Sequence, residues 1–462
     1  MFRMQLLADA AWRLGPRPVA LALWGKGPGR WWAAHRLGAP QSDSLGGADV
    51  RPIWEAARWT TLPEDPQAAI QAWMAANPPF AGVHWQCGQE ASLRVLQLAR
   101  RLTPPLPGWA RPVLEAHERR IAANPAYALA QDNNHPISEA AGRLACALLL
   151  GGEVARASRR LDRVVARLVS ADGAFAQPSP AYHRLRVDVL VAVEAVRATW
   201  GGPPAGYGAR AAAAVRVLRR VAVMPRIGHQ DGSAFDGQAA PDLDRAEAAL
   251  GQLADDAGPW AAGWLRGWRE AGAQGFLRVG APFRPAQADF LHFDLWDGGV
   301  NVLRDAGTGA YNPAPGDRWW LGYFWSTAAH NTVEFDGEDQ MPRASRFLHA
   351  RWPQWGRDAD GDWVQDWRGR RHARAVEVRG REWRVVDRLA GPFREAVLRW
   401  RLAPGEWRLT AEGVEGPLGR VAVAGGTVTL EEGWESLAYG QVSRCPVLVA
   451  RGAGFETVVR LP

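Results

Sequence analysis

The sequence has few cysteines, a single lysine and no long hydrophobic run. Cys87, Cys146 and Cys445 lie far apart and form no CxxC pair, which excludes a disulfide framework. No segment reaches the roughly 20 apolar residues that a membrane-spanning helix needs. The first residues, MFRMQLLADAAWRLGPRP, are interrupted by charge and lack a signal-peptide core. We therefore expect the cytoplasm as the default compartment, with the periplasm as the alternative.

The charge of the chain is carried almost entirely by arginine. The formal net charge is +7, and Lys26 is the only lysine. A GC-rich codon bias explains this as well as function does, but arginine also binds carboxylates and sulfates through a bidentate fork. The sequence has no helix-turn-helix, zinc-finger or RNA-binding signature, so an acidic glycan is a better partner than nucleic acid. The 25 tryptophans, against 6 tyrosines, fit sugar stacking, although filling a core explains most single tryptophans.

The chain of 462 residues is long enough for two or three domains. Residues 1–65 are rich in Trp and Arg and predict a helical extension. From about residue 66 to about 275, apolar residues recur every three or four positions, which predicts an all-helical domain. Short alternating segments such as FLHFDLW and NTVEFDG follow, separated by Gly, Asp and Pro, and they predict an antiparallel sheet domain. We place the boundary between the domains at residues 280 and 281.

The segment QDNNHPISEA brings two amides and an imidazole to the start of a predicted helix. Asn133, Asn134 and His135 lie where free backbone N–H groups favour anions. Helix capping explains one asparagine. It does not explain two together with a histidine, so these residues are candidates for gripping a carboxylate.

The segment SPAYHRLRVD gives a second cluster, also at a helix start. Tyr182 stands beside His183 and Arg184, and nearby cations are expected to lower the pKa of its phenol so that it acts as an acid or base. A packed tyrosine with a surface histidine and arginine is the alternative.

Three further segments supply candidate substrate contacts. In GVHWQCGQEASLR, Glu90 and Arg94 are spaced to pair on one helix, and a structural salt bridge competes with substrate binding. The loop GHQDGSAFDG follows, and then the segments RDAGTGAY and YFWSTAAHNTVEFDG of the predicted sheet domain. Asp305 and His330 are two candidate metal ligands, fewer than the three of a zinc site. The candidate substrate-binding residues are Asn133, His183, Arg184, Glu90, Arg94, Trp85, His229, Asp231, Trp325 and His330.

Together QDNNH, SPAYHR and STAAHNTVEFDGEDQ resemble the heparinase II/III-like polysaccharide lyases and their alginate-lyase relatives, in order from about residue 80 to 350. The resemblance implies an incomplete (α/α) toroid at residues 66–280 and an antiparallel β-sandwich at residues 281–462. It also implies that Asn134 and His135 neutralise a uronate carboxylate while Tyr182 transfers a proton. His330 and Asp305 match ligands of a structural Zn²⁺.

The sequence departs from the family where HxHAD is common. The matching stretch reads PAQAD, so Pro285 and Gln287 replace both histidines, and glutamine is a poor zinc ligand. Three functions stay open: β-elimination of a uronate polysaccharide, hydrolysis by two carboxylates such as Glu90 and Asp231, and non-catalytic glycan binding or an accessory role in polysaccharide biosynthesis.

Overall fold

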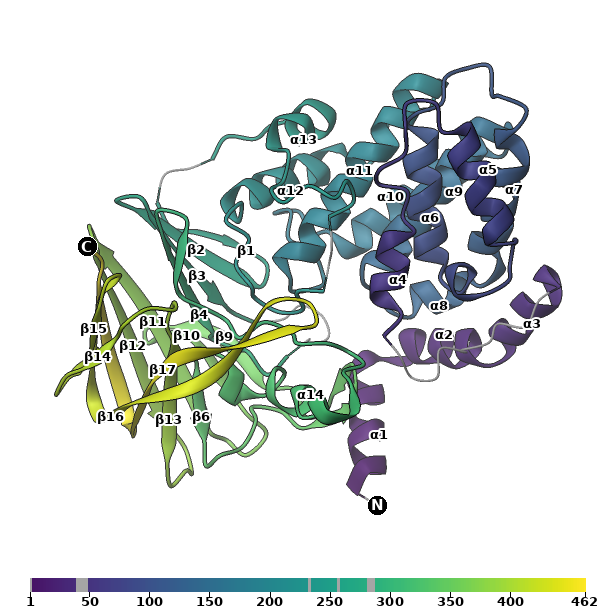
Figure 1. Ribbon diagram of the computed structural model, residues 1–462. Coiled ribbons are helices and arrows are strands. Elements are labelled where there is room, and N and C mark those ends of the chain that lie inside the picture. Colours follow the sequence, from purple (N-terminus) through teal and green to yellow (C-terminus); the bar gives the residue numbers. More distant parts are fainter. Residues whose placement is uncertain (1, 39–48, 232–233, 256–257, 281–286) are drawn as a thin grey trace.

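The computed structural model describes residues 2–38, 49–231, 234–255, 258–280 and 287–462. Helices fill one half of the molecule and strands fill the other, with the N-terminal helices extending beneath the helical half (Figure 1). No helix in these ranges combines the length and apolar character needed to cross a bilayer. The longer helices are α1 Phe2–Leu14, α2 Pro16–Lys26, α3 Pro28–Leu37, α4 Arg51–Ala56, α5 Gln67–Ala76, α6 Gly88–Ala99, α7 Ala110–Ala123, α8 Pro125–Leu129, α9 Asn134–Leu150, α10 Val154–Leu168, α11 Pro180–Trp200, α12 Gly208–Arg220, α13 Leu243–Leu250 and α14 Trp320–Tyr323.

Two long helices of the helical domain, α9 and α11, begin at capping residues and end at glycines. The Asn133 side chain caps α9 by accepting the His135 N–H, and Ser179 caps α11 by accepting the Tyr182 N–H. Gly151 and Gly201 follow these two helices with φ of 74° and 70°, a left-handed conformation that suits glycine. Helix α9 packs against α6, α10 and α11, and their apolar side chains form one core. Two helix starts, those of α9 and α11, are thereby fixed in one rigid body.

Strands begin earlier than the sequence pattern suggests. The expectation of helix up to about residue 275 is wrong for residues 260–278, which form β1 Trp260–Ala262, β2 Leu265–Glu270 and β3 Ala273–Arg278. The physical reason is the apolar spacing in this segment, where buried and less buried residues alternate along β2. The predicted boundary at residues 280 and 281 therefore falls inside a five-stranded sheet.

That sheet is an antiparallel meander in the order β1-β2-β3-β4-β5. A second, ten-stranded sheet runs β14-β15-β16-β17-β12-β11-β10-β9, with β13 joining β17 to β6. The remaining strands are β4 Phe293–Asp297, β5 Val300–Leu303, β6 Val333–Phe335, β7 Arg343–Ser345, β8 Leu348–His349, β9 Gln354–Asp358, β10 Gly361–Gln365, β11 Arg371–Arg379, β12 Glu382–Ala390, β13 Ala396–Arg401, β14 Arg408–Leu409, β15 Gly413–Gly416, β16 Gly419–Ala438 and β17 Gln441–Arg460.

The two sheets face each other across an aromatic core. The Phe293 ring on β4 lies 6.2 Å from the Trp383 ring and 6.3 Å from the Trp400 ring, which belong to the larger sheet. All three side chains are fully buried. Two antiparallel sheets with a shared apolar interior form a β-sandwich, and these tryptophans serve the core.

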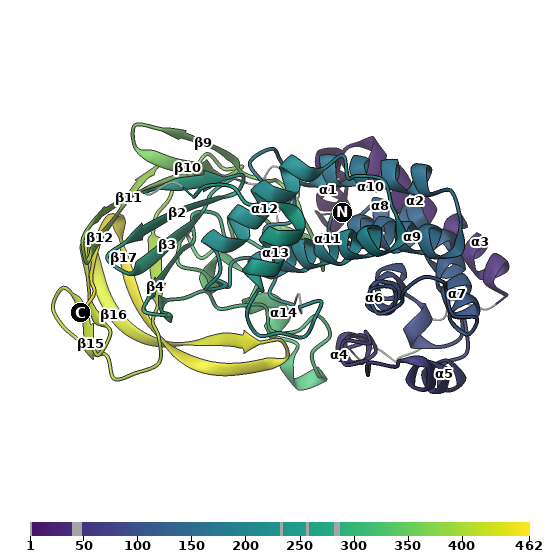
Figure 2. The ribbon, with the colours of Figure 1, turned by 90° about the horizontal axis from the view of Figure 1, so that it is seen from above.

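The hairpin of β16 and β17 extends beyond the sandwich toward the helical half, as the views in Figures 1 and 2 agree. Its turn is anchored at both domains: the Gly440 N–H donates to the Gly309 carbonyl at 2.9 Å, and the Arg226 side chain donates to the Leu437 carbonyl at 3.4 Å. The hairpin thus bridges the sheet and helical domains and brings Tyr439 beside Asp49.

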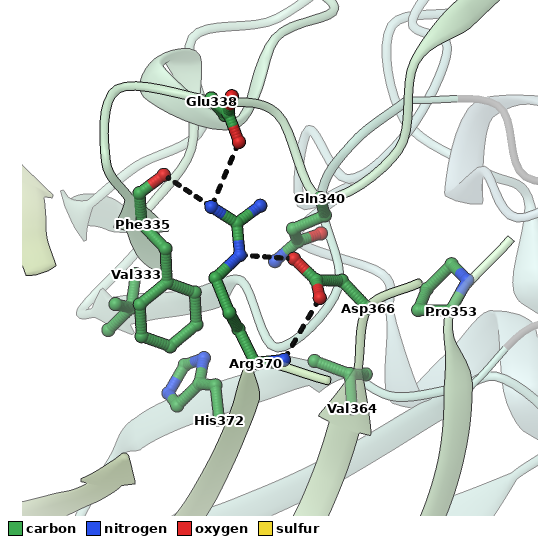
Figure 3. Close-up of a pocket in the computed structure, with 9 residues that line it drawn as sticks. All are labelled: Val333, Phe335, Glu338, Gln340, Pro353, Val364, Asp366, Arg370 and His372. Atoms are coloured by element: carbon green, nitrogen blue, oxygen red, sulfur yellow. Dashed lines mark hydrogen bonds and ion pairs between the residues drawn. The ribbon is translucent and has the colours of Figure 1, made fainter. Parts of the chain in front are cut away.

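A small cavity within the sheet domain is spanned by an arginine (Figure 3). Arg370 donates to the Phe335 carbonyl at 3.2 Å, to Glu338 at 3.0 Å and to Asp366 at 2.6 Å. Arg370, Glu338 and Asp366 thus pair with one another inside the cavity, which we interpret as a structural feature of the sandwich.

We predict that Phe293→Ala destabilises the sandwich by about 3 to 5 kcal/mol, because it leaves a cavity between three aromatic rings. The midpoint of urea unfolding, followed by tryptophan fluorescence, should fall accordingly. Leu409→Ala, at a side chain exposed on β14, should change the midpoint little. Equal midpoints for Phe293→Ala and the wild type would contradict the packing described above.

Candidate active site

The centre of the candidate site is a buried carboxylate shared by a phenol and a guanidinium. The Tyr182 hydroxyl, in the first turn of α11, donates to Asp231 Oδ2 at 2.6 Å. Arg51, the first residue of α4, donates to the same oxygen at 2.7 Å. The segment before α11 and the loop after Gly228 are tied together by Ser179, whose hydroxyl donates to the His229 carbonyl at 2.5 Å. Three separate stretches of chain therefore meet at Asp231.

The ionisation of this pair differs from the sequence-based expectation. Burial raises the pKa of Tyr182, and the Asp231 charge raises it further, while Arg51 opposes the rise. The expected lowering of the Tyr182 pKa by neighbouring cations is therefore wrong, because a carboxylate is its nearest charged partner. Burial would raise the pKa of Asp231, but Arg51 and His229 hold that pKa below its ordinary value. At neutral pH the phenol is protonated and Asp231 is ionised.

The amides and imidazole at the start of α9 divide their roles. Asn133 caps the helix, in agreement with the capping role that the sequence allowed for one asparagine. Its amide also donates to Gln131 at 3.1 Å. Asn134 is buried, and its amide donates to Gln89. His135 Nδ1 lies 4.0 Å from Cys87 Sγ. Asn134 and His135 therefore do not cap the helix, and they stay candidates for binding a carboxylate.

His135 is electrostatically linked to the Tyr182 pair. Burial lowers the pKa of His135, against the raising effects of Glu139, Glu90 and Asp231. Asp231, the hydrogen-bond partner of Tyr182, is therefore among the charges that act on His135. A lowered pKa keeps this imidazole neutral at neutral pH, so it can offer a hydrogen bond but no positive charge.

Two arginines that the sequence patterns did not single out, Arg51 and Arg58, bring positive charge to the site. Arg58 holds Glu90 with two hydrogen bonds of 2.7 and 2.8 Å. Burial would raise the pKa of Glu90, but Arg58 keeps that pKa below its usual range. Glu90 thus pairs with Arg58 in place of the predicted Arg94.

The sheet domain supplies one wall of the site. Burial raises the pKa of Tyr311, and the nearby charge of Asp231 raises it further. The His229 ring lies 5.7 Å from the Tyr311 ring and 5.2 Å from the Trp325 ring. The Tyr439 hydroxyl, at the tip of the β16–β17 hairpin, accepts the Tyr311 N–H at 2.8 Å. His229 and Trp325 thus lie in the wall between the two domains, as a shared site requires.

Other predicted substrate contacts have structural partners. Arg94 donates to His117 at 3.1 Å and to the His84 carbonyl at 2.8 Å, and it lies over the ring of Trp85. Trp85 itself is fully buried and donates to the Asn77 carbonyl. These side chains offer no open face to a sugar, which corrects their assignment as substrate contacts.

The two residues after Tyr182 also turn into the helical domain. His183 is buried with Nε2 2.8 Å from the Ala214 carbonyl. Arg184 donates to the carbonyls of Ala239 and Ala240 at 3.0 and 2.8 Å, and so fixes the loop that leads to α13. Both roles support the helix packing around Tyr182 and leave neither side chain directed at a substrate.

A second buried group could hold a metal. The ligand atoms of His292, Asp305 and His330 lie within 4.8 Å of one another, and all three side chains are fully buried. His330 Nδ1 is 2.7 Å from Asp305 Oδ2. Nε2 of His292 and Nε2 of His330 are buried without a hydrogen-bond partner in the described part of the chain. Two imidazoles and a carboxylate are a donor set that suits zinc, so the residues fit such an ion.

The third member, His292, was missed by sequence reasoning. It lies inside the strand-like segment FLHFDLW, where a histidine on an apolar stretch gives no spacing signal. Pro285 lies outside the described residues. Gln287 is buried and donates to the carbonyls of Gly307 and Phe324, both at 3.3 Å. Gln287 therefore supports the chain near Asp305, while His292 completes the ligand group.

Comparison with known proteins agrees with the predicted architecture. Residues 262–459 match the family described as heparinase II/III-like, C-terminal. A heparinase III structure superposes with a TM-score of 0.60 and 14% identity, over 94% of this chain and 84% of that chain. A heparan sulfate lyase HepC from Pedobacter heparinus gives a TM-score of 0.57 and 17% identity, over 99% and 87%. Another heparinase III gives 0.58 and 18%, over 86% and 72%. No curated protein matches the sequence.

These findings confirm the resemblance and the fold class. The helical toroid followed by an antiparallel sandwich is the architecture that the chain shares with these structures. At such low identity the likeness establishes the fold, and the family match itself lies on the sheet domain. The assignment of individual residues depends on the geometry described above.

We predict that Glu139 makes stability depend on pH. Burial raises the pKa of Glu139 to about 8, from an ordinary value of 4.5. Between these values the unfolded chain releases a proton that the folded chain retains, so stability is full below the lower value and falls as the pH rises toward the higher one. The thermal midpoint of Glu139→Gln should therefore gain on that of the wild type between pH of about 5 and about 8.

The matched control is Glu118→Gln, at a half-buried carboxylate on α7 that pairs with Arg143. Its thermal midpoint should run parallel to that of the wild type over the same range. Parallel curves for Glu139→Gln would show that the carboxyl is already ionised in the folded protein.

Proposed function

We propose that this chain, whose residues 262–459 belong to the heparinase II/III-like C-terminal family, is a polysaccharide lyase that cleaves a uronate-containing acidic polysaccharide by β-elimination. The observation that carries the proposal is the buried hydrogen bond from Tyr182 to Asp231, on a helix that packs against α9, where Asn134 and His135 lie. The heparinase-like fold supports it.

The chemistry begins at the proton on C5 of a uronate, which lies next to the carboxylate. Its removal builds negative charge on that carboxylate, so hydrogen-bond donors and nearby cations lower the barrier. We assign the hydrogen bonds to Asn134 and to the neutral His135. Arg51 and Arg58 supply positive potential from fixed positions, since each is held by a buried carboxylate.

Tyr182 carries the proton in this scheme. As the phenol oxygen accepts the C5 proton, its own proton passes along the 2.6 Å hydrogen bond to Asp231. The phenol then protonates the leaving oxygen at C4 and recovers its proton from Asp231. The C5–H and C4–O bonds break, a C4–C5 double bond forms, and both side chains end unchanged. The raised phenol pKa suits the second half of this sequence, in which Tyr182 acts as an acid.

Hydrolysis by Glu90 and Asp231 is disfavoured by their ionisation. A glycosidase needs one carboxyl with a raised pKa as the general acid. The pKa values of both Glu90 and Asp231 lie below their ordinary values, because each carboxylate is paired with an arginine. Neither group is therefore available to protonate a glycosidic oxygen at neutral pH.

For the second buried group we propose a structural Zn²⁺ held by His292, Asp305 and His330. Zinc at this position would join β4, the end of β5 and the segment before β6, which lie apart in the sequence. Bound there, the ion would stabilise the sandwich wall that carries Trp325 and Tyr311. No step of the elimination scheme requires it.

We predict that Tyr182→Phe lowers the rate of elimination by about a hundredfold or more, because it removes the proton-transfer group. The measurement is the ultraviolet absorbance of unsaturated uronates formed from a panel that includes heparan sulfate and alginate. Glycan binding, followed by affinity electrophoresis, should change little because the ring remains.

Tyr207→Phe is the matched control. Tyr207, at the start of α12, is another buried phenol, and it donates to the carboxylate of Glu194 on α11. Full turnover in Tyr182→Phe would overturn the assignment of Tyr182. Glycan binding by the wild type without any cleavage would favour the non-catalytic role, and new reducing ends without absorbance would favour hydrolysis.

We predict that the wild type retains about one zinc ion per chain after loading and dialysis, measured by plasma mass spectrometry, and that His292→Ala retains less than about a tenth of it. His35→Ala, at an exposed histidine on α3, is the control. Chelation should lower the thermal midpoint of the wild type and leave that of His292→Ala unchanged. A wild type that takes up no zinc would exclude the ion.

A further inference from the structure

We propose that helices α1, α2 and α3 form a docking surface for an anionic lipid bilayer. Among the described residues, large hydrophobic side chains that are exposed to solvent concentrate on these helices. Seven of the 17 such side chains lie there, within the first 32 residues: Phe2, Met4, Trp12, Leu23, Trp24, Trp31 and Trp32. So dense an exposed apolar set calls for a partner surface.

Helix α3 has a buried face of small and apolar residues and, away from it, two exposed tryptophans. Gly29, Ala33 and Leu37 are buried at four-residue spacing and pack toward α7. At 100° per residue, Trp31 lies on the opposite face and Trp32 lies on the flank between the two faces. Both indoles are exposed, and their ring centroids are 5.0 Å apart. The aromatic face of α3 therefore points away from the protein.

Helix α2 repeats this arrangement. Pro18 and Gly25 are buried, and Gly25 packs closely against Tyr127 of α8. Leu23 and Trp24 project from the other side, with Leu23 70% exposed. Packing thus fixes the orientation of α2 and leaves its outer apolar face uncovered.

Helix α1 attaches to the sheet domain by its inner face and leaves Trp12 outside. Leu6 and Ala10 pack against Ala344 and Ala350. Trp12 is 85% exposed. The three helices lie along one side of the molecule, next to one another in the chain, beneath the helical half (Figure 1).

The charge of helices α1 to α3, which we call the N-terminal arm (residues 2–38), indicates which partner the surface binds. Residues 2–38 carry one carboxylate, Asp9, and this carboxylate is paired with Arg13. The cationic side chains of the same segment are Arg3, Arg13, Arg17, Lys26, Arg30 and Arg36. Exposed tryptophans flanked by lysine and arginine match the interface of an anionic bilayer, where indoles sit at the headgroups and cations bind phosphates.

Two other occupants fit less well. A second copy of the arm would bring a second cationic surface against the first, and like charges oppose such contact. An acidic glycan would satisfy the arginines and stack on indoles. However, it offers little apolar surface for Phe2, Met4 and Leu23, which are also exposed. A bilayer satisfies the cations and the aliphatic side chains together.

The arm also adjoins the candidate site. Arg17 Nη1 lies 3.8 Å from Asp132, the residue before Asn133. Docking of α2 on a bilayer would therefore hold the start of α9 close to the lipid headgroups. That placement suits action on a glycan attached to a membrane.

The test is co-sedimentation of the full chain with vesicles of phosphatidylcholine, with and without about 30% phosphatidylglycerol. We expect binding to the anionic vesicles and at least about tenfold weaker binding to the neutral ones. Trp12→Ser/Leu23→Ser/Trp31→Ser and Arg3→Gln/Lys26→Gln/Arg36→Gln should each weaken anionic binding by about tenfold or more.

The control variant Arg408→Gln/Leu409→Ser changes an exposed cation and an exposed leucine on β14 of the sandwich, and it should bind like the wild type. Circular dichroism confirms that each variant is folded. Unchanged vesicle binding by both arm variants would overturn the proposal. So would heparin binding that needs the arm without vesicle binding, or a dimer seen by sedimentation velocity that the arm variants abolish.

Discussion

The ionised Asp231 is the constraint on which the candidate site depends. A carboxylate removed from water must be compensated by charge and hydrogen bonds, or it takes up a proton. Arg51 and Tyr182 provide that compensation from α4 and α11, at 2.7 and 2.6 Å. Since the same interactions fix the phenol in place, the electrostatic requirement of one buried charge also positions the group proposed to move protons.

The sheet domain takes part in the same network, so neither domain forms the site alone. Tyr311 of the sandwich lies near enough to Asp231 for that charge to raise its pKa, and the Tyr439 hydroxyl, at the tip of the long hairpin, accepts the Tyr311 N–H at 2.8 Å. Asp49, two residues before Arg51, accepts from Tyr439 at 2.5 Å. The chain therefore joins its N-terminal and C-terminal regions at the site, and any relative motion of the two domains would change the surroundings of Asp231.

Local signals predicted the elements well, and they failed where contacts cross the chain. Capping of α9 by an asparagine was among the predictions, and Asn133 is that cap. The resemblance brought Tyr182 and Asn134 forward together. Arg51, which stands 180 positions from Asp231, carries no local mark, although it helps keep Asp231 ionised. Burial and the charge of Asp231 then raise the pKa of Tyr182, which the neighbouring cations in the sequence were expected to lower. His292 was also missed, because a histidine within the apolar strand segment FLHFDLW gives no spacing signal of a metal ligand.

His292 shows how a group of candidate metal ligands can form although Gln287 stands where the family commonly has a histidine. The sequence holds Gln287 where the family commonly has a histidine, and a motif comparison taken alone implies a lost ligand. In the structure a histidine five positions along the chain lies 3.4 Å from Asp305, close to His330. A metal responds to the positions of donor atoms and is indifferent to which residue of the chain supplies them. Because Gln287 hydrogen-bonds the backbone carbonyls of Gly307 and Phe324, a glutamine at 287 leaves the group of His292, Asp305 and His330 intact as a candidate for holding a metal.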